Sequence, residues 1–309
     1  MMKFDKHGQL IKDMKLGRGQ GPAELSAPPG ELFIDSHDNL YIHDGYKLVA
    51  IDKNFIFMRN IYLVPIPRSE VCIDSYGFFY TLRSVFEETR SYTILGKFND
   101  AGKLVKTISC FPPMALKARP GIFLYVSHPY APRPLYCLTV DNHIVVALNL
   151  EYQLFQYDLD GNLVSTIAVE AKREKISRQE KDVVENDLGK TKISGARIAS
   201  EIDFPEHRPA IKGLFSDEKG RMYVVRAKSV LDKGTEEIID IFSRDGKYLY
   251  QTKLPAYPNY LRNGVIFFFR EETHQTGEPI YKVIRSVIRN YSSLRESEVP
   301  NSRLNSHRH

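Results

Sequence analysis

Short apolar runs alternate with polar turns along most of the chain, and one eight-residue phrase recurs. The phrase is an aromatic residue or Ile, a small polar residue, a polar turn that usually contains Gly, and then an apolar pair. Its clear copies are 4–11 (FDKHGQLI), 98–105 (FNDAGKLV), 157–164 (YDLDGNLV) and 242–249 (FSRDGKYL). Gly in such a turn supplies the positive φ that a tight connection between two strands needs. Each copy therefore predicts a β-hairpin.

Two weaker copies extend the series. Residues 51–56 repeat the phrase without Gly, and Tyr281 within 279–283 suggests a sixth copy. The first residues of the copies then stand at positions 4, 51, 98, 157, 242 and 281. Because a four-stranded propeller blade takes about 40–45 residues, this spacing predicts six outer hairpins, one for each blade of a β-propeller.

A second phrase, two apolar strands joined by a polar turn, precedes five of the six copies. It covers 32–42, 71–80, 138–146, 214–224 and 260–268. Near-continuous apolar runs are typical of strands that are buried on both faces, so these predict the inner strand pair of each blade. The first copy has no inner pair, since the chain opens directly on Lys3 and Phe4. We therefore expect an incomplete first blade, in an N-terminally shortened version of a longer protein.

Two segments carry a family resemblance. Gly17–Leu25 (GRGQGPAEL) resembles the Gly-rich linker between blades of bacterial six-bladed propellers related to NHL repeats, and 204–212 (FPEHRPAIK) is similar to the start of that group's fourth full blade. The resemblance extends to about Arg285. It implies an all-β, NHL-like six-bladed β-propeller over residues 1–288, followed by a polar tail at 289–309 that we expect to be disordered. It also implies a periplasmic or extracellular protein if the chain is N-terminally shortened.

Composition agrees with a packed β protein. Hydrophobic residues make up 42% and aromatic residues 11% of the chain, more than a disordered chain has. The net charge of +5 is mild and both signs are interspersed, which argues against nucleic-acid binding and membrane insertion. The three cysteines have no metal-ligand spacing, and no signal peptide is visible in the first ten residues.

Two long insertions fall between the fourth strand of one blade and the first strand of the next. They cover 111–134 and 170–209. The second begins with a helix-like stretch around 171–190, whose thin apolar stripe (Ile176, Val183, Val184 and Leu188) is suited to lying over the propeller. Connections of this type share one face of a propeller, so we expect the working surface there.

The candidate ligand-binding residues lie in or beside such connections. They are Arg18, Arg68, Arg119, His128, Tyr130, Arg133, His207 and Arg208. A rim of arginines could hold a carboxylate, a phosphate or an acidic sugar through paired hydrogen bonds. In the alternative interpretation these arginines pair with glutamates of neighbouring loops. Those glutamates are Glu87, Glu88, Glu236, Glu237, Glu271 and Glu272.

No catalytic residue, metal site or cofactor is predicted. The HExxH, G-x-S-x-G and P-loop motifs are absent, and Gly17–Gly21 followed by Pro22 indicates a linker turn. His37–Asp38 and His43–Asp44 are interpreted as turn residues. Asp35, Asp74, Asp141 and Asp217 recur, but each belongs to a turn phrase and is expected to cap its own hairpin.

These observations favour a non-enzymatic binding or scaffold propeller. It would recognise a peptide, a glycan or a partner protein on the face that carries the long loops. The alternative is a channel-centred, metal-dependent hydrolase or lyase of the six-bladed lactonase type, which would need converging acidic or His side chains. RNA binding would require a broad basic face, for which the interspersed charges give little support.

Overall fold

The computed structural model describes residues 2–4, 9–28, 30–35, 37–62, 71–87, 91–112, 128–189, 202–273, 279–288 and 304–305. Strands form most of this part of the chain, accompanied by one helix, so the predicted all-β class with a helical insertion is confirmed. The chain divides into two compact units, Met1–Pro113 and Met114–His309.

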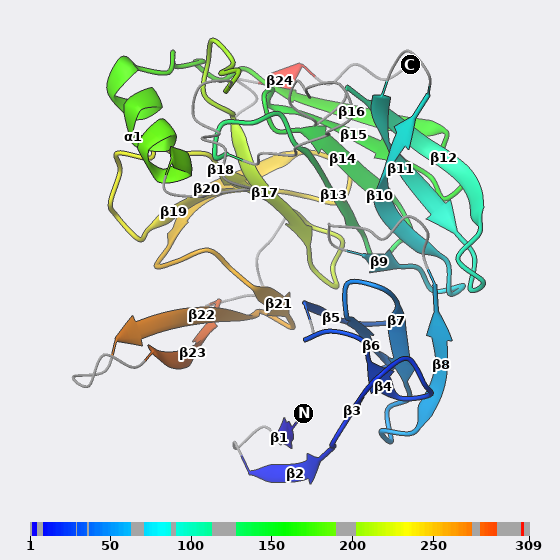
Figure 1. The fold of residues 1–309 in the computed structure, drawn as a ribbon. Coiled ribbons are helices and arrows are strands. Elements are labelled where there is room, and N and C mark those ends of the chain that lie inside the picture. The colour runs from blue at the N-terminus through cyan, green and yellow to red at the C-terminus, as the bar shows by residue number, and fades with distance from the viewer. Residues whose placement is uncertain are drawn as a thin grey trace. The chain divides into compact units, whose positions relative to one another are not determined.

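The first unit holds two four-stranded antiparallel sheets in which consecutive strands are neighbours (Figure 1). The first blade consists of β5 (Glu31–Ile34), β6 (Leu40–His43), β7 (Leu48–Ile51) and β8 (Phe57–Ile61). The second consists of β9 (Cys72–Ile73), β10 (Phe79–Phe86), β11 (Ser91–Phe98) and β12 (Leu104–Phe111). Before them come the hairpin β1 (Met2–Phe4) and β2 (Leu10–Asp13), and the parallel pair β3 (Gly17–Arg18) and β4 (Glu24–Leu25).

The second unit holds three blades. The third consists of β13 (Pro134–Leu138), β14 (Ile144–Leu148), β15 (Gln153–Tyr157) and β16 (Leu163–Val169). The fourth consists of β17 (Ile211–Ser216), β18 (Met222–Arg226), β19 (Glu237–Phe242) and β20 (Tyr248–Leu254). The fifth has β21 (Tyr260–Arg262), β22 (Val265–Thr273) and β23 (Pro279–Val287). The helix α1 (Arg178–Gly189) lies between β16 and β17 in the sequence, and β24 (Leu304–Asn305) pairs with β16.

The described residues therefore form five propeller blades, and the expectation of six is wrong. All five predicted inner pairs are present, from β5–β6 to β21–β22. The first copy of the outer phrase forms only the two-stranded β1–β2 sheet, which is too small to count as a blade. The last copy forms no turn, because Tyr281 lies inside β23, opposite Glu271 of β22. Of the predicted tail, only Leu304 and Asn305 belong to the described residues.

Eight of the predicted turns share one backbone conformation, while the turn of the first copy, at 5–8, lies outside the described residues. In each, the fourth turn residue has a positive φ between 59° and 83° and donates its N–H to the carbonyl of the first. These fourth residues are Asp38, Phe55, Gly77, Gly102, Asn142, Gly161, Gly220 and Gly246. Gly adopts this conformation without steric cost, whereas Phe55 does not. The ring of Phe55 lies below the ammonium groups of Lys3 and Lys12, at 5.0 and 5.7 Å.

Three inner hairpins are also fastened by an aspartate and a tyrosine six residues later. The pairs are Asp35–Tyr41, Asp74–Tyr80 and Asp217–Tyr223, with hydroxyl-to-carboxylate distances of 3.1, 2.8 and 2.8 Å. The other carboxylate oxygen accepts backbone N–H groups of the turn, so each aspartate caps its own hairpin as expected. In the third blade Thr139, not Asp141, takes the first turn position, and its hydroxyl oxygen accepts the His143 N–H at 3.1 Å.

The cores lie between blades within each unit. In the second unit, fully buried side chains of the third and fourth blades, among them Leu154, Ile211 and Phe242, form one apolar cluster. The first strands β13 and β17 are joined by a 2.6 Å hydrogen bond from the Ser216 hydroxyl to the Leu138 carbonyl. The ends of these strands therefore have fixed positions relative to each other.

Candidate functional site

The helix α1 begins with a capping box. The carboxylate of Glu180 accepts the Ser177 N–H and hydroxyl on Oε2, at 2.8 and 2.9 Å, and the Glu180 N–H donates back to the Ser177 hydroxyl at 3.3 Å. This reciprocal pattern satisfies backbone donors that a helix start otherwise leaves without partners. The predicted helix around 171–190 is therefore present but begins later, at Arg178.

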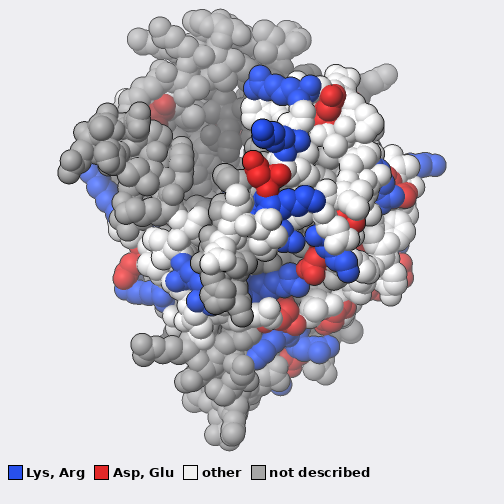
Figure 2. Space-filling view, turned by 90° about the horizontal axis from the view of Figure 1, so that it is seen from below, with Lys and Arg blue, Asp and Glu red and all other residues white. Residues whose placement is uncertain are grey.

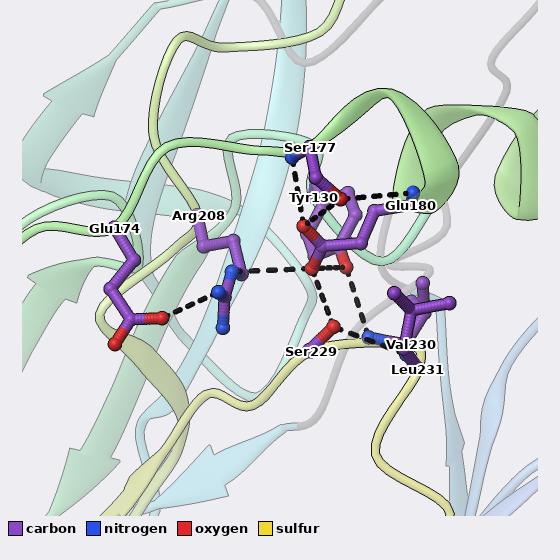
Figure 3. A network of polar contacts seen from close by, with 8 residues as sticks. All are labelled: Tyr130, Glu174, Ser177, Glu180, Arg208, Ser229, Val230 and Leu231. Carbon is purple, nitrogen blue, oxygen red and sulfur yellow. Dashed lines mark hydrogen bonds and ion pairs between the residues drawn. The ribbon is translucent and has the colours of Figure 1, made fainter.

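The second carboxylate oxygen of Glu180 fastens the helix to the rest of the unit (Figure 3). Oε1 accepts the hydroxyl of Tyr130 at 2.7 Å and that of Ser229 at 2.5 Å. The guanidinium of Arg208 lies beside it, with Nε at 3.2 Å. Glu180 thus joins four parts of the chain that are far apart in sequence. We call Glu180, Tyr130, Ser177, Arg208 and Ser229 the Glu180 network.

Burial and hydrogen bonding act against each other on Glu180, whose side chain is only 2% exposed. Burial alone would raise its pKa, but the hydrogen bonds from Ser229, Ser177 and Tyr130 outweigh it and lower the pKa to about 2. Burial raises the pKa of Tyr130, so its hydroxyl remains a donor. With a pKa of about 2, Glu180 is ionised near neutral pH. A useful general acid or base needs a pKa near the working pH, so Glu180 serves as an anchor and not as a proton-transfer group.

Arg208 sits between two glutamates of the insertion. Its guanidinium pairs with Glu174 through Nη2 as well as with Glu180, and its backbone N–H donates to the Glu174 carbonyl at 2.8 Å. Close by, Lys175 and His207 form an antiparallel bridge, which ties the start of the insertion to its end. Arg208 thus follows the alternative interpretation, an arginine held by glutamates, although its partners are not among those the sequence suggested.

An apolar cluster lies beside the polar network. It contains Tyr130, Ile176 and Val184, with Leu188, Phe204 and Val230 packed against them. The ring of His128 lies 5.1 Å from that of Phe204, and burial lowers the pKa of His128. Ile176, Val184 and Leu188 of the predicted apolar stripe thus pack on loops of the third and fourth blades, and Val183 is not part of this cluster.

The described candidate residues of the second unit fall into two groups of contacts. His128, Tyr130, His207 and Arg208 gather around the insertion, but Arg133 lies in a different set of contacts. Arg18 is exposed in β3 of the first unit. Arg68 and Arg119 lie outside the described residues. The sequence signal for Glu180 was its place three residues after Ser177, the spacing of a capping box, and Glu180 was not among the predicted site residues.

Arg133 belongs to a second polar group, the basic cluster, which we define as Arg133, Lys212, Lys228, Glu237 and Tyr257. Arg133 Nη2 donates to the Lys212 carbonyl at 2.7 Å, and the Lys212 ammonium donates to Glu237 Oε1 at 2.5 Å. Lys228 lies 3.7 Å from the same oxygen. No chemical motif singles out Lys212 or Lys228 in the sequence, because the segments that bring them together differ in length and composition.

Among the described residues of the second unit, the most deeply buried acid is Asp240 of β19. It accepts hydrogen bonds from the hydroxyl of Tyr152, from Arg226 at 2.6 Å and from Gln251 at 2.8 Å. Burial, followed by the charge of Asp240, raises the pKa of Tyr152. Asp240 therefore receives donors from two blades and joins them.

A metal site and a membrane-spanning helix would each be visible as an arrangement of the described residues. These residues contain no group of three or more His, Cys, Asp or Glu side chains placed to hold a metal ion. His43 and Asp44 are buried, contrary to their interpretation as surface turn residues. No helix in the described ranges is long and apolar enough to cross a membrane. Figure 2 shows Lys and Arg interspersed with Asp and Glu over the described surface of the face in view, as the sequence indicates.

No protein-family model matches the chain, and no curated protein sequence matches it. Similar solved structures include a Bacteroides fragilis protein assigned as exported, 11% identical over 86% of this chain and 73% of that one, with a TM-score of 0.49. A catalytically inactive virginiamycin B lyase from Staphylococcus aureus is 12% identical over 94% and 77%, with a TM-score of 0.41. A gluconolactonase from Xanthomonas campestris is 10% identical over 77% and 68%, with a TM-score of 0.33. At these values the similarities assign neither a family nor an activity to this chain.

Proposed function

We propose that this chain is a non-enzymatic binding or scaffold propeller that recognises its ligand on the side of the insertion in the second unit. The observation that carries the proposal is the Glu180 network. It holds the insertion, the segment around Tyr130 and the loop at Ser229 in one fixed arrangement. Loops fixed in this way present a binding surface without the entropy cost of ordering on contact.

The buried acids support binding over catalysis. Glu180 has a pKa of about 2, and Asp240 is surrounded by donors from four side chains. Both are used to join parts of the fold. A metal-dependent hydrolase or lyase is the competing function, and an assay of lactone hydrolysis with added cations tests for it.

The family relationship and the location belong to the same proposal. The resemblance of Gly17–Leu25 and of residues 204–212 to NHL-related bacterial propellers supports the proposal that this chain is related to that group. It also supports a periplasmic or extracellular setting, where glycans, peptides and partner proteins are the available ligands.

The test is binding of the whole chain to a peptide array and a glycan array, with the Glu180→Gln variant beside it. We expect the wild type to bind a defined set of features and the variant to bind them about tenfold more weakly, because the loops lose their anchor. Glu185→Gln, on the same helix but outside the network, is the matched control and should bind like the wild type.

Two results would contradict the proposal. One is the absence of any bound feature on both arrays. The other is cation-dependent hydrolysis of a lactone by protein that was first stripped of metal and then given Mg²⁺, Ca²⁺ or Zn²⁺.

A further inference from the structure

Each of three segments that Glu180 holds also supplies one basic side chain of the basic cluster. Arg133 follows Tyr130 by three residues, Lys212 follows Arg208 by four, and Lys228 directly precedes Ser229. The first two stand at the start of β13 and β17, the first strands of the third and fourth blades. The network that fixes the insertion therefore also fixes the positions of three cations.

These side chains are connected across blades. Arg133 reaches the Lys212 carbonyl at 2.7 Å, and the Lys212 ammonium lies 5.3 Å from the centre of the Tyr257 ring. Tyr257 belongs to the connection between β20 and β21, so the third, fourth and fifth blades all contribute. Gly213 permits this approach, because a Cβ there would stand 2.3 Å from the Tyr257 hydroxyl.

Glu237 lies at the centre of the basic cluster and can accept more hydrogen bonds than it does. Its side chain is 5% exposed, and Oε1 accepts the Lys212 ammonium. Its other oxygen, Oε2, is buried and has no hydrogen-bond partner among the described residues. A carboxylate can accept about four hydrogen bonds, and a buried oxygen without a donor is costly. Glu237 Oε2 thus lacks the donor that it needs, and a small rotation of the Glu237 carboxylate toward the surface would let this oxygen accept a hydroxyl group from a ligand.

The charges around Glu237 favour an anion. Arg133, Lys212 and Lys228 carry three positive charges against the single negative charge of Glu237. Lys228 is held by the carbonyls of Gly234 and Glu236, at 2.5 and 3.2 Å, so it contributes charge from a fixed position. Arg133 is exposed and Lys212 is 38% exposed. These two can therefore contact a ligand directly, and a guanidinium has five N–H donors in a fork that fits a carboxylate.

From this arrangement we propose that the basic cluster binds an acidic sugar. The sugar carboxylate pairs with Arg133 and Lys212, and a neighbouring hydroxyl donates to Glu237 Oε2. The inference rests on the proposed binding function and names its ligand class. A simple carboxylate has no hydroxyl to donate to Glu237 Oε2. A neutral sugar has no negative charge to pair with Arg133 and Lys212.

The experiment is calorimetric titration of the whole chain with three probes: trigalacturonate, the neutral maltotriose, and tricarballylate, which has three carboxylates and no hydroxyl. We expect trigalacturonate to bind about tenfold more tightly than either of the others. Arg133→Met should weaken trigalacturonate about tenfold, with Arg133→Lys intermediate. Glu237→Gln should remove the preference over tricarballylate. Arg244→Met, which changes an exposed arginine in the turn between β19 and β20, is the control and should have no effect.

Equal binding of tricarballylate and trigalacturonate would overturn the proposal, since it would indicate a site for any anion. Unchanged binding in Arg133→Met, with the fold intact by circular dichroism, would overturn it as well. If trigalacturonate does not bind while the arrays show other bound features, the ligand class is wrong and the binding function stands. If the arrays are also blank, the function itself is wrong.

Discussion

The hydroxyl of Tyr130 donates a 2.7 Å hydrogen bond to Oε1 of Glu180, a residue 50 positions later in the chain. The same hydroxyl accepts the backbone N–H of Val230 at 2.9 Å, so one tyrosine links the helix α1 to the loop between β18 and β19. Tyr130 is 1% exposed, and this burial makes each of its hydrogen bonds costly to lose.

Replacing Glu180 by Gln should destabilise the second unit by about 3 kcal/mol, because the half-buried Arg208 loses one of its two charged partners and two hydroxyls lose the charged acceptor that they share in a buried site. Urea unfolding followed by circular dichroism measures the change. Glu185→Gln should stay within about 0.5 kcal/mol of the wild type. A Glu180→Gln variant as stable as that control would show that the network does not hold the insertion.

The lowered pKa of Glu180 predicts that the stability difference between the wild type and Glu180→Gln depends on pH. Glu180 has a folded-state pKa of about 2, below its ordinary value of 4.5, so its contribution is complete above that ordinary value. The contribution is lost as the pH falls from about 4.5 toward 2. The difference in unfolding free energy between wild type and Glu180→Gln should therefore shrink over this range. A difference that stays constant down to pH 2 would contradict the lowered pKa.

The aspartate–tyrosine pairs predict a local effect within a blade. Tyr80→Phe removes the 2.8 Å hydrogen bond to Asp74 and should cost about 1–3 kcal/mol, because the Asp74 oxygen is buried. Tyr76→Phe is the matched control, since Tyr76 lies in the same turn and is 73% exposed. Thermal unfolding of both variants tests this, and equal midpoints would count against the pairing.

Gly213 is expected to tolerate no side chain. Gly213→Ala would place a Cβ 2.3 Å from the Tyr257 hydroxyl and 2.9 Å from ring carbons, which should cost about 1–3 kcal/mol. Adding Tyr257→Ala should make the Gly213→Ala substitution much less harmful. Gly30→Ala meets nothing nearer than 3.7 Å and serves as the control. Unfolding free energies of the single and double variants form the required cycle.

The sequence was most informative where one structure repeats. Turn residues with positive φ, such as Gly102 and Gly161, and the apolar inner pairs were predictable because every blade obeys the same local rules. The count of blades was not, since Phe4 and Tyr281 match the phrase although neither leads to a four-stranded sheet. Whether a hairpin joins a blade depends on partners that the phrase does not contain.

The candidate site was predictable only in part. Tyr130 and Arg208 were identified from their place in long connections, and they do meet, but at a glutamate that was not considered. Lys212 was noted only as the end of a segment that resembles a blade start, and Glu237 was expected in a loop as the partner of an arginine rather than of a lysine. Their pairing depends on the way in which β17 and β19 each pair with β18, which lies between them, and no local pattern in the sequence records this.

The hydrogen bond between aspartate and tyrosine within a single hairpin has a consequence for how such a chain can evolve. Because Asp74 and Tyr80 need nothing from the neighbouring sheet to make their bond, a blade carries the means of shaping its own inner turn. A gene segment that encodes one blade can thus be copied, lost or replaced with that turn intact. Thr139, in the place of the aspartate, shows that the fastening itself can be exchanged while the turn is kept.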